Sequence, residues 1–168
     1  MNADQAYLFH QTPPELAKRL MEFVPLVAGD RVIEPFRGEG AFWSAFPSWV
    51  SKDWAEIRQG RDYRDLSGGY DWVITNPPFR LETNGKRVNS FWALLDYYSQ
   101  RAEKGICFLA NDVCLGTLTP KRHQILSDRG WGITQIVVCS VKKWRGRYFF
   151  IVLEKGKPSV FRFLTDNF

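Results

Sequence analysis

The stretch Thr75-Asn76-Pro77-Pro78-Phe79 follows a short apolar run, residues 72–74, that is typical of a buried strand. The two prolines end the strand, because proline lacks an N–H and has a fixed φ. Asn76 precedes a proline, so its backbone is restricted to an extended conformation. The pattern therefore predicts a stiff loop at the carboxyl end of a strand, which is where open α/β sheets bind their ligands.

The side chains of this loop suit the recognition of a planar amino group. The carboxamide oxygen of Asn76 and the carbonyl of Pro77 can both accept hydrogen bonds from one NH2 group. Two acceptors draw the amino nitrogen away from planarity and free its lone pair for attack. Phe79 offers a flat face for a heterocycle or an amide. The alternative, an ordinary proline-rich turn, is disfavoured because the motif comes directly after an apolar strand.

Composition predicts one soluble globular domain over residues 1–168. Hydrophobic residues make up 45% of the chain and charged residues 24%. No stretch approaches the roughly 20 apolar residues of a membrane span, and no leader pattern opens the sequence. Three scattered cysteines and only two histidines argue against a disulfide framework and against a metal centre. A reducing cytoplasm is the expected location.

The net charge is +5, and the positive residues are clustered. Such clusters are either a solvated face or the contact surface for a polyanion. We expect them to bind nucleic acid, with Trp144 as a second aromatic face for a base unless its indole lies in the core. The candidate residues, besides Trp144, are Arg80, Lys86, Arg87, Lys121, Arg122, Lys142, Lys143, Arg145 and Arg147.

A second loop, residues 34–42, follows the predicted first strand at residues 31–33. Gly38 and Gly40 allow a tight turn and a close approach of the backbone to a ligand, and a short helix over residues 41–46 follows. A lone Gly-x-Gly is weak evidence, but its place between a strand and a helix strengthens it. The loop lacks the lysine of a nucleoside-triphosphate loop. Because Glu34 opens the loop, it suits a positively charged ligand better than a phosphate.

The second strand is expected within residues 49–57 and ends at Glu56, which lies 22 residues after Glu34. Dinucleotide folds place an acid for the ribose hydroxyls at about this spacing. Asp53 is a rival for that role, and either carboxylate could instead be an ordinary surface group.

The remaining elements follow from periodicity and capping. We expect a helix with Thr12 as N-cap, a polar mobile loop over residues 80–90, and helices over residues 90–104 and 120–129. Strands are expected at residues 106–110, 133–139 and 148–153, the last two as an antiparallel pair. Residues 161–163 either form an edge strand or trail.

Together these motifs resemble the class I S-adenosylmethionine-dependent methyltransferases, and among them the enzymes that methylate adenine N6. The resemblance is carried by Glu34-Pro35-x-x-Gly38-x-Gly40-x-Phe42 and by Asn76-Pro77-Pro78-Phe79, in this order. The segment Phe9-x-Gln11-Thr12-Pro13 is similar to an extra motif of that family, and its place before the glycine loop matches the gamma group.

The resemblance implies an α/β, Rossmann-like fold with a seven-stranded, mostly parallel sheet, an antiparallel strand and helices on both faces. It also implies S-adenosyl-L-methionine as cofactor and transfer of its methyl group to the N6 amino group of adenine in DNA. Asn76, Pro77, Pro78 and Phe79 would be catalytic. The cofactor would be bound by Thr12, Pro13, Glu34, Pro35, Phe36, Gly38, Gly40, Phe42, Glu56, Asp62, Tyr63 and Asn76.

The sequence departs from the family pattern in two ways. Residues 40–71 are compressed, which leaves open whether Asp53, Glu56 or Asp62 binds the ribose. No target-recognition domain follows the last strand, as in small stand-alone enzymes of phages and mobile elements. We therefore expect little sequence specificity, unless a homodimer or a partner subunit supplies it, and a bacterial or phage-infected cytoplasm as location.

Three alternatives remain open from the sequence. The first is an adenine-N6 methyltransferase that acts on RNA, because the pocket chemistry is the same. The second is a protein methyltransferase that modifies the glutamine amide nitrogen with the same Asn-Pro-Pro-aromatic loop. The third is a catalytically silent subunit that scaffolds a partner, which the intact loop motifs disfavour.

Overall fold

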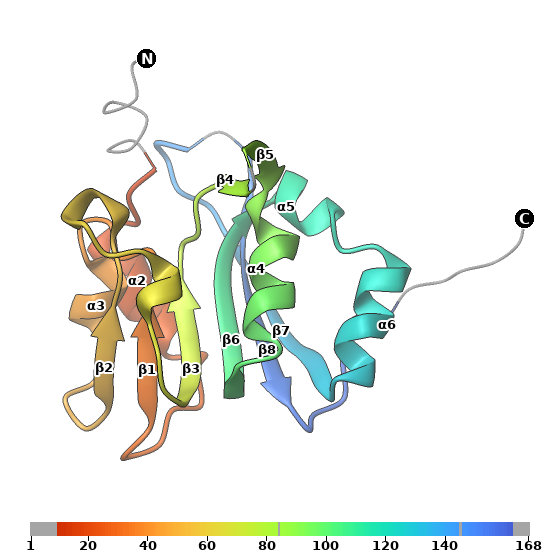
Figure 1. The fold of residues 1–168 in the computed structure, drawn as a ribbon, viewed down its shortest axis with the longest axis horizontal. Coiled ribbons are helices and arrows are strands. Elements are labelled where there is room, and N and C mark those ends of the chain that lie inside the picture. The colour runs from red at the N-terminus through yellow and green to blue at the C-terminus, as the bar shows by residue number, and fades with distance from the viewer. Residues whose placement is uncertain (1–9, 84, 145, 163–168) are drawn as a thin grey trace, which may run out of the picture.

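A computed structural model describes residues 10–83, 85–144 and 146–162. Its main sheet has six strands: β1 (Arg31–Glu34), β2 (Ser51–Trp54), β3 (Tyr70–Thr75), β6 (Ala102–Asn111), β7 (Trp131–Cys139) and β8 (Tyr148–Lys155). Their order across the sheet is β2-β1-β3-β6-β8-β7 (Figure 1). Strands β2, β1, β3 and β6 are parallel neighbours, whereas β8 is antiparallel to both β6 and β7. The mostly parallel Rossmann-like sheet and its antiparallel strand are confirmed.

The sheet has six main strands rather than the seven expected. Only residues 55–69 connect β2 to β3, and they form two short 3-10 turns, η1 (Ile57–Gln59) and η2 (Tyr63–Asp65). A crossover that returns to a parallel sheet needs about a dozen residues, so this connection cannot also add a strand of its own. Residues 161–162 form no strand either.

Helices cover both faces of the sheet (Figure 1). On one face α2 (Pro14–Met21) and α3 (Ala41–Ala45) pack over Val32, Ile74 and Cys107. On the other face α4 (Ser90–Tyr98), α5 (Asp112–Gly116) and α6 (Pro120–Asp128) share a core with alternate strand residues. This alternation follows from the two-residue period of a strand, and it places the parallel strands between two apolar layers.

Residues 80–89 form a hairpin rather than the expected polar loop. Its strands, β4 (Arg80–Thr83) and β5 (Lys86–Asn89), are antiparallel, with Leu81 opposite Val88. Leu81 packs against the core on the α4 side, which gives the hairpin an apolar support. The residues on either side of the hairpin are hydrogen-bonded to each other, because Ser90 N donates to Phe79 O at 3.2 Å.

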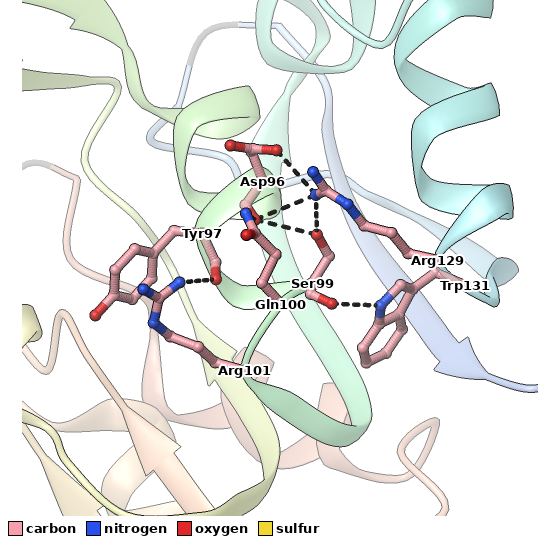
Figure 2. Close-up of polar contacts among 7 residues, drawn as sticks. All are labelled: Asp96, Tyr97, Ser99, Gln100, Arg101, Arg129 and Trp131. Carbon is pink, nitrogen blue, oxygen red and sulfur yellow. Dashed lines mark hydrogen bonds and ion pairs between the residues drawn. The ribbon is translucent and has the colours of Figure 1, made fainter.

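The carboxyl end of α4 is tied to the turn between α6 and β7 (Figure 2). Arg129 Nη1 donates to Asp96 Oδ1 at 2.8 Å and to Ser99 Oγ at 2.7 Å. Trp131 Nε1 donates to Ser99 O at 2.9 Å. The helix ends at Tyr98 and β6 begins at Ala102, so α4 is shorter, and β6 longer, than the sequence predicted.

Two of the predicted helix starts have different outcomes at the N-cap. Thr119 is the N-cap of α6 as expected, and its side chain accepts a hydrogen bond from Arg122 N. Thr12 does not cap α2, because the N-cap position is taken by Pro13 and no side chain caps the helix. The hydroxyl of Thr12 is engaged elsewhere, as described below.

Within the described ranges, the helices are all too short or too polar to cross a lipid bilayer. The same ranges contain no group of three or more histidine, cysteine, aspartate or glutamate side chains placed to hold a metal ion.

Candidate functional site

A cavity of about 310 Å³ lies at the carboxyl ends of β1 and β3. Both loops that the sequence analysis singled out contribute to it, together with the segment before α2. It is lined by His10, Gln11, Thr12, Glu34, Phe36, Arg37, Gly38, Ala41, Glu56, Ile57, Arg58, Asn76, Pro77, Pro78 and Phe79. Its size is at the lower end of the range for small-molecule sites.

The glycine turn forms one wall of the cavity. Gly38 has φ +51°, a left-handed conformation that favours glycine, and a Cβ at this position would have to displace the side-chain oxygen of Gln11. The N–H of Gly38 donates to Glu56 Oε2 at 2.8 Å. Gly40 has φ +82° and is the N-cap of α3. The turn therefore lies between Gln11 and Glu56.

Asn76 forms the opposite wall, and its carboxamide has a defined orientation. Its Nδ2 donates to the carbonyl of His10 and to Thr12 Oγ1, both at 3.1 Å. A carbonyl can only accept, so the contact with His10 fixes which end of the amide is nitrogen. Asn76 Oδ1 accepts no hydrogen bond from the residues described. Thr12, 8% exposed, is thus a support for Asn76 rather than a helix cap.

Glu34 places a carboxyl group against the cavity. The residue is 2% exposed, and its Oε2 has no hydrogen-bond partner in the described part of the chain. Burial raises the pKa of Glu34 to about 9, because the ionised form loses its hydration. A cationic group in the cavity would favour the ionised form and give Oε2 a partner.

Of the three acids proposed for the ribose, only Glu56 lines the cavity. Its Oε1 accepts from Arg58 N at 3.1 Å, and its Oε2 from Gly38 N, which holds the carboxylate in place. Asp53 instead forms a bidentate pair with Arg61, whose guanidinium lowers the pKa of Asp53.

Asp62 and Tyr63 lie outside the cavity lining. Asp62 caps the turn η2 and pairs with Arg64, which lowers the pKa of Asp62. Tyr63 packs on Phe36, with the ring centroids 5.2 Å apart, so it supports a cavity residue from behind. The other expected cofactor residues outside the lining are Pro13, Pro35, Gly40 and Phe42. Of these, Phe42 is a core residue, 1% exposed.

Sequence reasoning missed six residues that line the cavity: His10, Gln11, Arg37, Ala41, Ile57 and Arg58. Ile57 lines the cavity and is 69% exposed, so it offers an apolar surface to a ligand. The sequence feature that could have identified Ile57 as a cavity residue is its position directly after Glu56. His10 and Gln11 lie within the segment that had already been noted for Thr12.

The predicted basic clusters occupy different places. Arg80, Lys86 and Arg87 are exposed on the hairpin, which begins directly after Phe79. Lys142, Lys143 and Arg147 are exposed in the loop between β7 and β8, at the same edge of the sheet (Figure 1). Arg145 lies outside the described residues.

Lys121 and Arg122 lie on α6, at the opposite end of the sheet from β1 and β2 (Figure 1). Arg122 Nη1 donates to Thr117 O at 2.6 Å, and its guanidinium lies over the Trp92 ring. Arg122 is thus part of the local structure between α5 and α6, away from the cavity.

Trp144 is 5% exposed and packs on Tyr148, with ring centroids 4.3 Å apart. It belongs to the core under α2 and α3. The expectation that it stacks on a base therefore needs correction, because a buried indole has no face to offer a ligand.

Solved structures with the same architecture are methyltransferases. One is a protein of Listeria monocytogenes assigned to the class I S-adenosylmethionine-dependent methyltransferases, with TM-score 0.68, 15% identity and 91% of this chain covered. The fold is that of the class I methyltransferases. The chain spans 64% of the length of that Listeria protein.

Two further structures show how varied the proteins with this fold are. A protein of Pyrococcus horikoshii assigned as an RNA methyltransferase has TM-score 0.56 at 14% identity, with 86% of each chain covered. The E. cuniculi Mtq2–Trm112 complex, which methylates the translation termination factor eRF1, has TM-score 0.57 at 14% identity, covering 89% of this chain and 99% of that one. No family model matches the sequence, and no curated protein does.

Proposed function

We propose that this protein transfers a methyl group from S-adenosylmethionine to the N6 amino group of adenine in DNA, with little sequence specificity of its own. The observation that carries the proposal is the orientation of Asn76. Its nitrogen is bound by His10 and Thr12, so its oxygen is the end that remains for an amino group of a substrate.

The cavity residues suit this cofactor. Glu34 is a buried carboxyl with an oxygen lacking a partner among the described residues, and a cationic ligand would satisfy it. Glu56 is held by two backbone N–H groups and retains acceptor capacity for hydroxyl groups. Gly38 lines the cavity next to Glu56 and Gln11. S-adenosylmethionine, when bound, would supply a methyl group activated by a positively charged sulfur.

The residues of the chain then act by positioning and polarisation. Asn76 Oδ1 and Pro77 O would accept the two N–H bonds of the amino group and direct the nitrogen lone pair at the methyl carbon. Asn76 is an amide and cannot be a general base, so the proton leaves to solvent after transfer. Phe79 would stack on the base, which contributes roughly 1–3 kcal/mol. In duplex DNA the adenine must be flipped out of the helix first.

A nucleic acid is favoured as substrate by the exposed cations near the cavity, which suit a phosphate backbone, and DNA is the nucleic acid we propose. The hairpin and the β7–β8 loop present lysine and arginine at the edge of the sheet where the cavity lies. The first test is to incubate the protein with labelled S-adenosylmethionine and, separately, DNA, RNA and cell-extract protein. Label in the DNA fraction, on adenine, is the expected result, and label only in RNA or protein would overturn the proposal.

The second test is the variant Asn76→Ala. It should still bind S-adenosylhomocysteine, because Glu34, Glu56 and the glycine turn remain, and it should lose methyl transfer by at least about 100-fold, because the amino group loses its acceptor. Gln124→Ala, which removes an exposed amide on α6 away from the cavity, is the control and should leave the rate unchanged. An Asn76→Ala variant that methylates DNA at the rate of the parent would show the mechanism to be wrong.

A further inference from the structure

The segment His10–Thr12, here called the strap, joins the two walls of the cavity. On one side Asn76 Nδ2 donates to His10 O and Thr12 Oγ1. On the other side Gln11 Oε1 accepts from the N–H of Glu39 in the glycine turn, at 3.0 Å. All three strap residues line the cavity. The position of the strap therefore affects both the cofactor wall and the wall of Asn76.

A basic residue bonds the strap from outside the cavity. Lys143 Nζ donates to Gln11 O at 3.1 Å, although the two residues are 132 positions apart in sequence. Figure 1 shows the β7–β8 loop beside the start of the chain's described part. The charge of Lys143 also contributes, after burial, to lowering the pKa of His10, which is consistent with this proximity.

Lys143 is exposed, so its contact with Gln11 is weak alone. A single exposed hydrogen bond contributes little to stability, because water competes for both groups. An ammonium group has three N–H donors and can bond a carbonyl and a phosphate oxygen at the same time. A phosphate would restrict the flexible lysine side chain while its bond to the strap persists. The neighbour Lys142 is equally exposed, and no strap contact is seen for it.

We propose that Lys143 couples DNA binding to cofactor retention: a DNA phosphate bound to its ammonium fixes the strap over the cavity and strengthens cofactor binding. Lys143 is then a positioning residue that acts through Gln11, not a catalytic one. Coupling of this kind is reciprocal, so bound cofactor strengthens DNA binding by the same factor. The inference rests on the proposed function, since it takes the cavity as the cofactor site.

The test measures the Kd of S-adenosylhomocysteine by calorimetry, for the full chain alone and with a short DNA duplex that saturates each variant. In the parent, the duplex should lower this Kd by about fivefold or more, the range typical of such coupling. Lys143→Met should abolish the effect of the duplex. Lys142→Met should retain it, and Lys143→Arg should restore it because a guanidinium also offers several donors.

The outcomes are distinct from those that test the proposed function. A parent protein that does not bind S-adenosylhomocysteine at all would overturn the proposed function. A parent that binds it with a Kd unaffected by the duplex would overturn only the coupling. The coupling would also be overturned if Lys143→Met responded to the duplex as the parent does. Matching melting temperatures of the variants would show that each of them folds.

Discussion

Glu34 carries a carboxyl group that the fold buries against the cavity, with few groups to stabilise its charge. Arg37 and Lys52 favour the ionised form and Glu56 disfavours it, but burial is the largest effect and raises the pKa to about 9. In the ligand-free protein Glu34 is therefore protonated at neutral pH. Binding of a cation in the cavity would release this proton, since the positive charge favours the carboxylate.

This pKa predicts how stability depends on pH. The folded state holds the Glu34 proton more tightly than the unfolded state, whose pKa is near 4.5. Its contribution to the free energy of unfolding is therefore full below pH 4.5 and declines as pH rises toward 9, by at most about 1.4 kcal/mol per pH unit. Urea unfolding of Glu34→Gln should show a weaker decline over this window than the parent. Glu82→Gln, an exposed acid on the hairpin, should decline as the parent does, and the same decline in both variants would contradict the assignment.

At the scale of elements, the contacts drawn in Figure 2 hold α4 against the turn between α6 and β7. Ser90, the first residue of α4, donates hydrogen bonds to the carbonyls of Pro78 and Phe79, which line the cavity. The helix therefore connects the turn between α6 and β7, at its carboxyl end, to the cavity at its amino end. We expect Arg129→Ala to lower the free energy of unfolding by about 1–2 kcal/mol, because it removes bonds to both Asp96 and Ser99.

Arg101→Ala is the matched control for this prediction. Arg101 is exposed, just after the end of α4, and contacts Tyr97 by donating to its carbonyl at 2.8 Å and by lying over its ring. Its loss should lower the free energy of unfolding by less than the loss of Arg129 does, at most about 0.5–1 kcal/mol. Denaturant unfolding compares the two variants, and an equal effect of both would show that the bonds from Arg129 do not anchor the helix.

The elements that sequence could predict are those encoded by local patterns. Thr119-Pro120 begins α6 as predicted, and the apolar runs before Asn76 and around residue 151 are strands. The hairpin was missed because its residues are polar outside Leu81 and Val88, and its packing against α4 and the core is not visible in the local sequence. Thr12 was misjudged because its pattern is that of an N-cap, while its actual partner Asn76 lies 64 residues away.

At the scale of the whole molecule, two groups of exposed cations, on the hairpin and in the β7–β8 loop, lie at the edge of the sheet that carries the cavity. Lys86 and Arg87 are exposed there, whereas Lys52 on β2 donates to Trp43 O and lies over the Trp43 ring. If the exposed residues bind phosphates, DNA affinity must fall steeply with salt, because each contact releases a counterion.

Fluorescence anisotropy at several salt concentrations tests this prediction. Plotted as log K against log salt concentration, Lys86→Met and Arg87→Met should each reduce the slope by about 0.9. Lys52→Met should leave the slope as it is in the parent. Equal slopes for the hairpin and the Lys52 variants would mean that the hairpin does not contact the backbone of DNA.

Sequence alone located both loops of the candidate site but not how they are joined. The motifs around Gly38 and Asn76 predicted two walls, and the cavity between them has both. The strap and its bond to Lys143 depend on contacts between distant segments, for which no local pattern exists. The connection between β2 and β3 is short, and within it Glu56 lies beside the glycine turn, whereas Asp53 and Asp62 do not line the cavity.

Strand β8 lies between β6 and β7 although it is the last of the three in the chain. During synthesis on the ribosome, β6 emerges well before the strand that completes its hydrogen bonding. A nascent chain that has reached only the β7–β8 loop therefore presents an open backbone edge along Ala102–Asn111, in an apolar strand of the kind that aggregates. Closure of the sheet must await residues 148–155, so a chain paused before Tyr148 would keep this edge open to pairing with other chains.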